Sequence, residues 1–559
     1  MKPRNLLPLQ LFATCLVGLL LGKFCFSTSK EKVELSLFNG KLSKMQSVIN
    51  IIDNRYVDAV DIDSINELVI PDILSRLDPH TSYIPAKRLN DVDKKVVGHY
   101  YGIGIEHFPI NDTSTVITIV EGSPAYSSSI RPGDKIIKID DVDVTGHNAT
   151  DKVSEVIKGE HDSKAKLTIK RYGVDSLMEI SIPRGIVPVL STTACYMIDS
   201  TTAYIKLDNF GDNSYQEFAE SVYGLEYRGA ENLIIDLRGN LGGRVDQARR
   251  IASELLSRGD TIVYTTGRDH EIEDVYIDTT QYDLCSGIRI ACLVDGYTAS
   301  AAEILSAAIQ DNDRGIIIGR RTFGKGLVQT PILMQDGSQL RLTTHRYYTP
   351  SGRSLQKGYN NYDNDLSNRY KRGELDSASA FHPSDSTKYY TKNGRVVYSK
   401  CGVMPDVFVP LNRAPLPDIV HKFDSAAMTM RFAIEKYGQL GDQASTRFIH
   451  EMLDDEAKTY EELISYSRLH GINIDPRKQK NEISEAMPMI MATLKSDVFH
   501  IIGDDNQSTK YFNSDDNVLD TAVMILNDLD RLTNILNINN KTIKQDNGKT
   551  TIIRDKDRN

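Results

Sequence analysis

Residues 185–357 alternate short apolar runs with amphipathic segments, and this alternation constrains the fold more than any other feature of the sequence. NLIIDLRGN and IRIACLVDG have the length of buried strands, while VDQARRIASELL and AAEILSAAIQ place apolar residues at helical spacing. Strands that alternate with helices pack as an α/β structure with buried strands. We therefore expect an α/β core at residues 185–414, interrupted by a polar, tyrosine-rich insertion at residues 358–400.

Further regions flank this core. Residues 31–86 place apolar side chains at helical spacing, and residues 87–184 contain short β-type runs, turns such as RPGD and one helical segment, DKVSEVIKG. Residues 415–540 again have a helical pattern, and residues 541–559 form a polar tail. A chain of 559 residues is too long for one ordinary core. The sequence therefore predicts an α+β chain of several domains.

The first thirty residues have the layout of an export signal. Lys2 and Arg4 precede a mostly apolar run from Leu6 to Gly22. This run is marginal for a membrane-spanning helix, and no clean cleavage site follows it. We interpret residues 1–30 as a cleaved signal peptide or as an uncleaved membrane anchor over residues 6–26, with a buried core helix as the remaining explanation. Either of the first two predicts an exported, periplasmic or cell-envelope protein.

Charge and cysteine content exclude some classes of function. The formal net charge of −10 argues against a protein that binds nucleic acid through the backbone phosphates. The cysteines beyond the N-terminal segment, Cys195, Cys285, Cys292 and Cys401, do not occur at metal-ligand spacing. A disulfide scaffold is not expected at this chain length, although one bridge from Cys285 stays open. We expect neither a metal ion nor a nucleic-acid partner.

Ser300 lies where the apolar run IRIACLV gives way to a helix. The stretch SAAE matches a capping box, with Ser300 as the cap and Glu303 three residues later, so this serine has a purely structural explanation. A serine at a strand-to-helix turn is also well placed as a nucleophile, because the neighbouring backbone N–H groups can hold an oxyanion. A nucleophile needs a base, so the presence of a base separates the two explanations.

Two kinds of base are available in this region. Histidine is the usual one, but His270 and His345 lie in no recognisable triad pattern. Lys325, in GRRTFGKGLVQT, is the alternative, because burial lowers a lysine pKa from its ordinary value of about 10.4. The side-chain carbonyl of Gln329, four residues further on, can then accept a hydrogen bond from the amine and aim it.

The segment around Lys325 also contains most of a phosphate-binding loop. Residues 319–325 read G-x-x-x-x-G-K after an apolar strand. However, Gly326 stands where a Ser or Thr would ligate magnesium, and LVQTPILM is not an amphipathic helix whose N-terminus could face phosphates. Nucleotide binding is therefore the weaker explanation of this lysine.

A third motif, IIDLRGNLGGRVDQA, runs from a buried strand through several glycines into a helix. A tight turn between strand and helix is the structural explanation. The functional explanation is that a glycine N–H supplies a second donor to an oxyanion, which requires no side chain at that position.

Together these motifs resemble the C-terminal processing peptidases, or tail-specific proteases, which are serine peptidases with a Ser-Lys catalytic pair. LRGNLGG, YTASAAEILSAAIQDNDRG, GRRTFGKGLVQT and YYTPSGRSLQ occur in the order seen in that family. Upstream, YYGIGIEH, VEGSPAYSSSIRPGDKIIKIDDVDVTG and VIKGEHDSKAKLTIKR resemble the PDZ domain of those enzymes. The resemblance implies a PDZ domain at residues 87–184 and a crotonase-like peptidase core at residues 185–414.

The resemblance also implies a role for each matched position. Ser300 corresponds to the nucleophile, Lys325 to the general base and Gln329 to the residue that orients the lysine. The backbone N–H groups of Ala301 and Gly242 correspond to the oxyanion hole, although the other glycine of the pair is an alternative to Gly242. No metal ion or other cofactor is implied.

The implied function is a serine endopeptidase of the cell envelope that recognises protein or peptide substrates by apolar C-termini. Gly102, Ile103, Gly104 and Ile105 match the PDZ loop that binds a terminal carboxylate through backbone N–H groups. A catalytically inactive scaffold that only binds tails is the alternative. The C-terminal helices are candidates for binding an adaptor or a second copy of the chain, and an uncleaved N-terminal segment would add contact with a membrane.

Overall fold

The protein is described from a computed structural model. Its chain separates into two compact units, Met1–Ile73 and Leu74–Asn559. In the first unit the structure describes two helices, α2 (Leu42–Arg55) and α3 (Ile62–Leu74), the second with Pro71 inside it. The described residues are 42–89, 97–280, 285, 287–360, 362–381, 387–412, 415–438, 440, 445–475, 477–538, 543–546 and 549–552.

The export signal predicted at residues 1–30 lies outside the described residues. Among the helices that are described, none combines the length and the apolar character that a membrane span needs.

A small antiparallel β module begins the second unit. Its main sheet has the order β3-β4-β5-β7-β8, with β6 beside β5, and β2 pairs separately with β9. Apolar side chains from the sheet and from α5 form its core, among them Val116, Ile136 and Val153. The elements are β2 (His99–Gly102), β3 (Ile105–Ile110), β4 (Thr113–Ile119), η1 (Pro124–Ser127), β5 (Lys135–Ile139), β6 (Val142–Asp143), α5 (Ala149–Val156), β7 (Lys164–Lys170), β8 (Met178–Pro183) and β9 (Gly185–Pro188).

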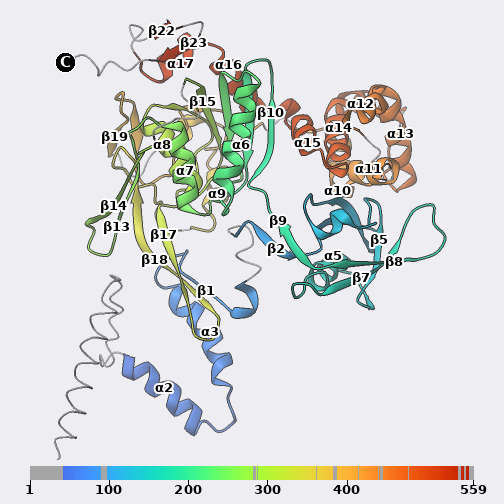
Figure 1. Cartoon of the computed structure of the whole chain (residues 1–559), viewed down its shortest axis with the longest axis horizontal. Coiled ribbons are helices and arrows are strands. Elements are labelled where there is room, and N and C mark those ends of the chain that lie inside the picture. Colours follow the sequence, from blue (N-terminus) through green and yellow to red (C-terminus); the bar gives the residue numbers. More distant parts are fainter. Residues whose placement is uncertain are drawn as a thin grey trace, which may run out of the picture. The chain divides into compact units, whose positions relative to one another are not determined.

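A six-stranded sheet of order β10-β11-β12-β15-β16-β21 forms the central core. Every neighbouring pair from β11 onward is parallel, and β10 is antiparallel to β11. Figure 1 shows helices α6, α7 and α8 beside this sheet. The elements are β10 (Thr192–Met197), β11 (Thr202–Leu207), α6 (Ser214–Tyr227), β12 (Asn232–Asp236), α7 (Val245–Leu255), β15 (Arg289–Val294), α8 (Ala301–Asp311), β16 (Gly315–Gly319) and β21 (Val407–Phe408).

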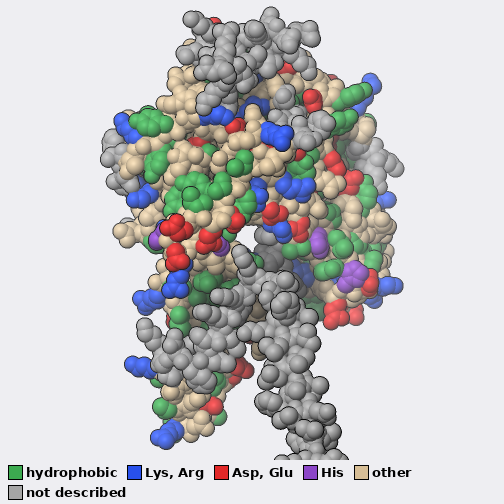
Figure 2. All heavy atoms as spheres, turned by 60° about the vertical axis from the view of Figure 1, so that its left-hand side comes forward, with side chains coloured by type: hydrophobic (Ala, Val, Ile, Leu, Met, Phe, Trp, Pro, Cys, Tyr) green, Lys and Arg blue, Asp and Glu red, His purple; other side chains and the backbone are tan. Residues whose placement is uncertain are grey.

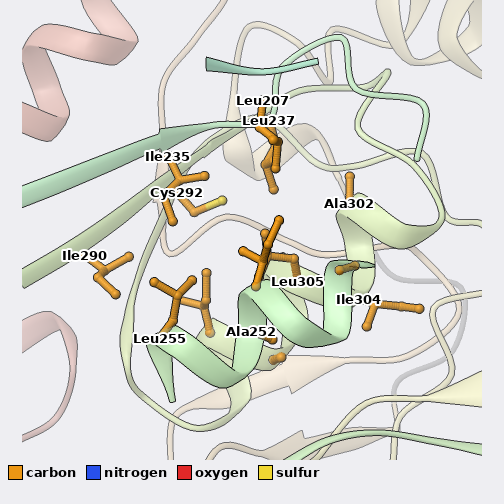
Figure 3. Close-up of a cluster of buried hydrophobic side chains, with 14 of the residues drawn as sticks. Leu207, Ile235, Leu237, Ala252, Leu255, Ile290, Cys292, Ala302, Ile304 and Leu305 are labelled. Atoms are coloured by element: carbon orange, nitrogen blue, oxygen red, sulfur yellow. The ribbon is translucent and has the colours of Figure 1, made fainter. Parts of the chain in front are cut away.

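The central sheet is covered on both faces, which explains why its strands are apolar at consecutive positions. On one face Leu233 and Ile235 of β12 pack with α7 and α8, and Figure 3 shows Ile235 among side chains of these helices, including Leu255 and Leu305. On the other face Ile234 packs with Val518 of α16 (Asn517–Leu526), and α17 (Leu529–Ile535) completes this cover.

A second sheet, of order β1-β18-β13-β14 with β17 also paired to β18, extends from the core. The long hairpin β17–β18 begins directly after the loop that carries Lys325. The described residues of the polar insertion form short elements. The elements of the sheet are β1 (Ser82–Ile84), β13 (Thr261–Thr266), β14 (Ile272–Ile277), β17 (Leu327–Leu333) and β18 (Gln339–Tyr348); those of the insertion are α9 (Asp365–Lys371), η2 (Ala378–Ala380), β19 (Lys388–Tyr390) and β20 (Val396–Tyr398).

The C-terminal helices form a bundle that packs on the outer face of the β module. Ile110 and Ile117 of the module belong to the same buried cluster as the helices. His500 of α14 lies between Asp505 at 3.0 Å and Glu106 of β3 at 3.1 Å, and these hydrogen bonds raise the pKa of His500 to about 10. The elements are α10 (Asp418–Ala426), α11 (Met428–Tyr437), α12 (Thr446–Leu453), α13 (Glu456–Leu469), α14 (Lys480–Ile501), α15 (Asp505–Phe512) and η4 (Asn513–Asp515).

The prediction of a multidomain α+β chain is confirmed by this arrangement of a β module, an α/β core and C-terminal helices. The region predicted to be a polar tail contains a strand pair, β22 (Ile543–Asp546) and β23 (Lys549–Ile552). On the face drawn in Figure 2, Lys and Arg side chains alternate with Asp and Glu, so the negative net charge is not gathered in one block there.

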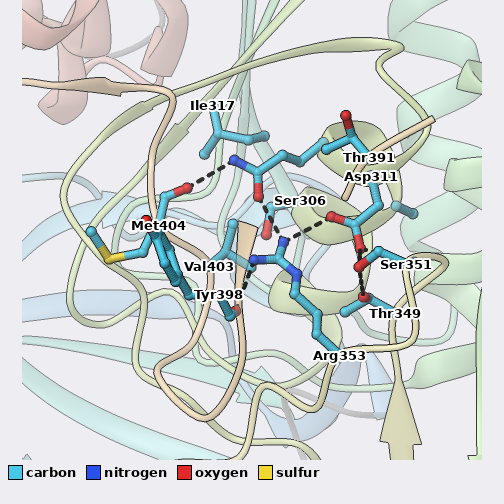
Figure 4. Close-up of polar contacts among 12 residues, drawn as sticks. Ser306, Asp311, Ile317, Thr349, Ser351, Arg353, Thr391, Tyr398, Val403 and Met404 are labelled. Atoms are coloured by element: carbon cyan, nitrogen blue, oxygen red, sulfur yellow. Dashed lines mark hydrogen bonds and ion pairs between the residues drawn. The ribbon is translucent and has the colours of Figure 1, made fainter. Parts of the chain in front are cut away.

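A fully buried ion pair ties the end of α8 to the segment after β18. The Arg353 guanidinium donates to Asp311 Oδ1 at 2.9 Å, to Gln310 Oε1 at 2.7 Å and to the carbonyl of Tyr398 at 3.2 Å. Figure 4 shows Arg353 between Asp311 and Tyr398, with Ser351 on the other carboxylate oxygen. Neither Arg353 nor Asp311 exposes its side chain to solvent. This pairing places residues 353–357 against the loop of Lys325, because Gln356 Oε1 accepts from the Gly326 N–H at 2.9 Å.

Removing the cation of this pair should destabilise the protein strongly. Arg353→Met leaves the Asp311 carboxylate buried without its counter-charge, which costs about 3–5 kcal/mol of unfolding free energy. Denaturant unfolding of the purified chain measures this loss. The double variant Arg353→Met with Asp311→Asn removes the unpaired charge and should recover part of the lost unfolding free energy. Equal stability of Arg353→Met and the unmodified protein would contradict this assignment.

Candidate active site

Ser300 occupies the sharp turn between β15 and α8. Its backbone has φ 58° and ψ −118°, a strained conformation that non-glycine residues rarely adopt. Strain of this kind is found where a strand-to-helix turn presents a nucleophilic serine. In the part of the chain that is described, neither the Ser300 hydroxyl nor the Ala301 N–H forms a hydrogen bond. The turn therefore leaves a hydroxyl and an adjacent N–H open at the positive end of α8.

The Glu303 carboxylate joins the Ser300 turn to the Lys325 loop. Oε2 accepts the N–H of Ser300 at 3.0 Å and that of Lys325 at 2.8 Å. Oε1 accepts the N–H of Gly324 at 2.7 Å and the hydroxyl of Thr322 at 2.5 Å. Glu303 is completely buried, and burial holds the pKa of its carboxyl above the ordinary value, although these four hydrogen bonds act in the opposite direction. All four partners are donors, which suits an ionised carboxylate.

The predicted capping box is thus present, but its purpose is wider than helix capping. The Glu303 half is a full hydrogen bond, whereas the Ser300 hydroxyl lies beside the Glu303 N–H without meeting the geometry of one, because that N–H donates to the Ser300 carbonyl at 2.9 Å. The same carboxylate sets the position of both backbone segments that carry the predicted nucleophile and base. Two more contacts join these segments. The Tyr347 hydroxyl donates to the carbonyl of Lys325 and lies 3.2 Å from that of Ser300, and the Phe323 N–H donates to the carbonyl of Thr298 at 2.9 Å.

Lys325 is a mostly buried amine with an altered pKa. Burial is the main cause that lowers its pKa to about 8; the positive charge of Arg341 acts in the same direction, and the carboxylates of Glu303 and Asp78 oppose the change. Among the described residues its ammonium group has no ion pair and no hydrogen bond. A buried lysine that is easily deprotonated and free of partners can accept a proton near neutral pH.

The glycine loop after β12 lies directly against Ser300. Gly242 has φ +99°, and a Cβ at this position would lie 2.8 Å from Ser300 Cβ and 3.0 Å from the Ala301 nitrogen. The N–H of Gly242 donates to Asn240 Oδ1 at 2.8 Å, so it is engaged within its own loop. The next N–H, that of Gly243, makes no hydrogen bond to any described residue. The structure thus brings Gly242 to the serine but gives its N–H another partner.

Gln329 lies on β17, where its amide nitrogen Nε2 donates to Thr343 Oγ1 at 3.3 Å. Its carbonyl oxygen accepts no hydrogen bond from the residues described, and no contact with the Lys325 amine is formed. Ser300, Ala301, Gly242 and Lys325 are therefore brought together by the fold, while the predicted role of Gln329 depends on how its amide is oriented. The catalytic roles of all these residues stay predictions.

Neither histidine considered from the sequence reaches Ser300. His345, on β18, pairs with Glu273 at 2.9 Å, and His270 lies in the turn between β13 and β14. A different histidine, His80, lies near Lys325. Burial and the positive charge of Lys325 lower its pKa to about 4, and its Nε2 contacts the Tyr362 hydroxyl at 2.6 Å.

Sequence reasoning did not single out His80: its segment, LDPHTSYIPAK, has the pattern of a turn at the end of a helical region and also resembles a segment of the peptidase family, but neither observation gives this histidine a role. The sequence feature that could have indicated His80 is the combination of Asp78, His80 and Thr81 in one short turn, because polar groups of this kind gather at active sites.

The loop Gly102–Ile105 of the β module has the features of an anion-binding loop. The carbonyl of Ile103 accepts from the Ala125 N–H at 2.8 Å, and that of Gly104 accepts from the Val120 N–H at 3.0 Å. The N–H groups of Ile103 and Gly104 donate to no described residue. A loop whose carbonyls are occupied and whose N–H groups are open can bind a terminal carboxylate.

The loop of Lys325 does not have the structure of a phosphate-binding loop. It connects β16 to β17, so no helix begins at Lys325. Within the described ranges, no group of three or more His, Cys, Asp or Glu side chains is placed to hold a metal ion.

Comparisons with known proteins match both parts of this architecture. Residues 201–363 match the model of peptidase family S41, and residues 115–171 match the model of the PDZ domain. A carboxy-terminal-processing protease of Bartonella bacilliformis is 32% identical over 320 residues, which cover 56% of this chain and 73% of that protein. The carboxy-terminal processing protease CtpA of Bacillus subtilis is 29% identical over 320 residues, 57% of this chain and 67% of that protein.

Among solved structures, the PDZ domain of a carboxy-terminal protease from Vibrio cholerae, in complex with a peptide, is 31% identical. It covers 16% of this chain and 99% of that chain, with a TM-score of 0.16.

Adding one methyl group beside Ser300 should abolish most of the activity without unfolding the protein. Gly242→Ala forces a Cβ against Ser300 and Ala301 and displaces the turn, and misplacement of this size can cost about 10²-fold in rate. Measurement of kcat/KM on a protein substrate tests this. Gly239→Ala is the matched control, because Gly239 also has positive φ in the same loop but meets nothing within 4 Å. Equal activity of the two variants would refute the assignment of this loop to the site.

Proposed function

The chain belongs to the carboxy-terminal processing proteases of peptidase family S41, and from this premise we propose that it cleaves proteins through an acyl-enzyme on Ser300 with Lys325 as the base. The observation that carries this proposal is the Glu303 carboxylate, which holds the Ser300 turn and the loop of a buried, easily deprotonated lysine together. A serine-type protease needs no more than a nucleophile, a base and an oxyanion hole.

The mechanism follows from the chemistry of these groups. Neutral Lys325 takes the proton of the Ser300 hydroxyl as its oxygen attacks the scissile carbonyl carbon. The Ala301 N–H and one N–H of the Gly242–Gly243 pair stabilise the oxyanion. When the tetrahedral intermediate collapses, the C–N bond breaks and the Lys325 ammonium gives its proton to the leaving amine.

Deacylation uses the same groups, with water in place of the Ser300 hydroxyl and the Ser300 oxygen in place of the leaving amine. Lys325, again neutral, takes a proton from a water molecule, and the resulting hydroxide attacks the ester carbon. The second tetrahedral intermediate expels the Ser300 oxygen, which recovers its proton from Lys325. Asn240 competes for the Gly242 N–H, so Gly242 serves as a donor only when the Asn240 side chain releases it, whereas the Gly243 N–H is already open.

The PDZ domain binds peptide or protein substrates, and we propose that it selects apolar C-termini. The open N–H groups of Ile103 and Gly104 would hold the terminal carboxylate. The last side chain would lie in the apolar surroundings of Ile105 and Val153, which belong to the buried cluster of this domain.

We also propose that the protein works outside the cytoplasm, in the periplasm or cell envelope. The support is the order of charge and apolar residues in the first thirty positions. Sequencing the N-terminus of the mature protein separates a cleaved signal peptide from a retained anchor.

Removing the Ser300 hydroxyl should remove proteolysis and leave the fold intact. We expect purified Ser300→Ala to leave an unstructured protein with an apolar C-terminus uncut, while the unmodified chain degrades it. Ser306→Ala, on the same helix, is the matched control and should retain activity, because the Ser306 hydroxyl only donates to the carbonyl of Glu303. Survival of the substrate with the unmodified chain as well would favour an inactive tail-binding scaffold.

Activity should rise with pH as Lys325 loses its proton. Its pKa is lowered to about 8, so the ammonium form predominates below that pH and cannot accept the serine proton. The profile of kcat/KM against pH should therefore have an acid limb near pH 8. Lys325→Arg keeps a charge that is not lost in this range and should be inactive throughout. A profile that is flat across pH 8 would contradict Lys325 as the base.

A further inference from the structure

The segment from Leu77 to Ile84 lies beside the hairpin that follows Lys325. Its strand β1 pairs with β18 through Ser82 opposite Arg341 and Ile84 opposite Gln339. This pairing brings Asp78, which precedes β1, to the side of β18 that carries Thr343. Asp78 has no part in the mechanism described above, yet its carboxylate is fully engaged in hydrogen bonds.

Four donors converge on Asp78. Its Oδ1 accepts the N–H groups of His80 and Thr81 at 2.8 and 2.9 Å and the hydroxyl of Thr343 at 3.2 Å. Its Oδ2 accepts the hydroxyl of Thr81 at 2.6 Å. Burial alone raises the pKa of this carboxyl, but the hydrogen bonds outweigh burial and hold the pKa below its ordinary value. Asp78 is therefore ionised at neutral pH.

An ionised carboxylate can only accept hydrogen bonds, and this fixes where the neighbouring protons point. Thr343 has a single hydroxyl proton, which it gives to Asp78. The Thr81 hydroxyl lies 3.2 Å from Thr343 Oγ1 but gives its own proton to Asp78 Oδ2 at 2.6 Å. The Thr343 oxygen is thus left to accept, and Gln329 Nε2 donates to it at 3.3 Å. The two ends of the Gln329 amide cannot exchange places without losing this bond. The polarity of the amide is thus set by Asp78 through Thr343.

This orientation leaves the carbonyl oxygen of Gln329 on the side away from Thr343. No described residue donates to that oxygen. Lys325, four residues earlier in the loop that leads into this hairpin, has an amine without a hydrogen-bond partner in the described ranges. An amine needs an acceptor to be aimed, and a reversed amide would present it with a donor instead.

We propose that Asp78 is a positioning residue for catalysis, which orients the Gln329 amide through the Thr343 hydroxyl so that its oxygen faces the Lys325 amine. This inference rests on the proposed Ser300–Lys325 mechanism. It makes the segment before β1 a part of the active site, although that segment is more than two hundred residues from Ser300 in the sequence.

The charges around Lys325 give the proposal a signature in the pH profile. The groups that face it are Glu303 on α8, Arg341 on β18, and Asp78 and His80 on the segment before β1. Asp78 is negative and raises the Lys325 pKa, so neutralising Asp78 should lower that pKa and move the acid limb to lower pH. General loosening of the site would admit water and move the limb to higher pH, toward the ordinary lysine pKa.

The first experiment compares Asp78→Asn with the unmodified full-length chain. An asparagine keeps its oxygen on the N–H groups of His80 and Thr81 and presents its amide nitrogen to the Thr81 hydroxyl, whose proton then turns to Thr343 Oγ1, 3.2 Å away. This frees the Thr343 proton to turn toward Gln329 and reverse its amide. We expect kcat to fall by about 10- to 100-fold with KM unchanged, and the acid limb of the pH profile to move to lower pH. Asp336→Asn is the matched control, because Asp336 accepts the N–H and hydroxyl of Ser338 at the tip of the same hairpin. It should leave kcat and the pH profile unchanged.

The second experiment tests the link through Thr343 and does not depend on the folding of Asp78→Asn. Thr343→Val has nearly the same shape but no hydroxyl and should lower kcat as Asp78→Asn does, whereas Thr343→Ser should retain most of the activity. The double variant Asp78→Asn with Thr343→Val should be no slower than the slower single variant, since both changes break one chain of contacts.

The outcomes separate this proposal from the proposed function. A fluorophosphonate probe that labels the unmodified chain but not Ser300→Ala supports the serine mechanism independently of Asp78. If labelling occurs while Asp78→Asn and Thr343→Val keep the unmodified kcat and pH profile, the positioning role is wrong. A shift of the acid limb to higher pH also overturns it. Failure of the unmodified chain to react with the probe would instead overturn the proposed function and the positioning role with it.

Discussion

The buried Glu303 carboxylate is the interaction on which the rest of the site depends. A charge without solvent is costly unless hydrogen bonds surround it, and here three backbone N–H groups and one hydroxyl do so. These donors come from both the Ser300 turn and the loop of Lys325. The carboxylate therefore has all of its hydrogen bonds only when the two loops lie together. Any movement that separates the two loops would leave the carboxylate partly unpaired, so the geometry between serine and lysine is held firmly.

The central sheet supplies the rigid base for these loops. The turn after β12 carries Gly242, the turn after β15 carries Ser300, and the loop after β16 carries Lys325, so three neighbouring parallel strands end at one edge. Ligands of open α/β sheets bind outside the carboxyl ends of such strands. The sheet can present them with little freedom because α7 and α8 cover one of its faces and α16 and α17 the other.

The sequence allowed the strands, the helices and the motifs that carry Ala301, Gly242, Glu303 and Lys325 to be predicted, because each motif is contiguous and has a local physical cause. Ser300, Ala301 and Glu303 share one helix start, and the buried lysine lies between two glycines. Contacts between distant segments could not be predicted in this way. Asp78, Thr343 and Tyr347 reach the site only through strand pairing, whose register the sequence does not reveal.

Two other features were beyond sequence reasoning for a similar reason. The hydrogen bond between Gly242 and Asn240 depends on one side-chain rotamer, and motif spacing carries no information about it. The last helices were predicted to be helical, but an amphipathic pattern does not say which surface the apolar side will cover. Their place on the far face of the catalytic sheet depends on packing with Ile234 and its neighbours.

That placement has a consequence for how the molecule is made. A chain emerges N-terminus first from the ribosome and from an export channel alike, so β10–β16 appear in the compartment where the protein folds before α16 and α17. Until those helices arrive, Ile234, Leu293 and Ile318 belong to an apolar sheet face that α16 and α17 do not yet cover. At this stage α7 and α8 can already cover one face of the central sheet, while the other face is exposed to solvent. Chaperones that shield apolar surface would act on this face, and the sheet under the active site becomes fully packed only near the end of synthesis.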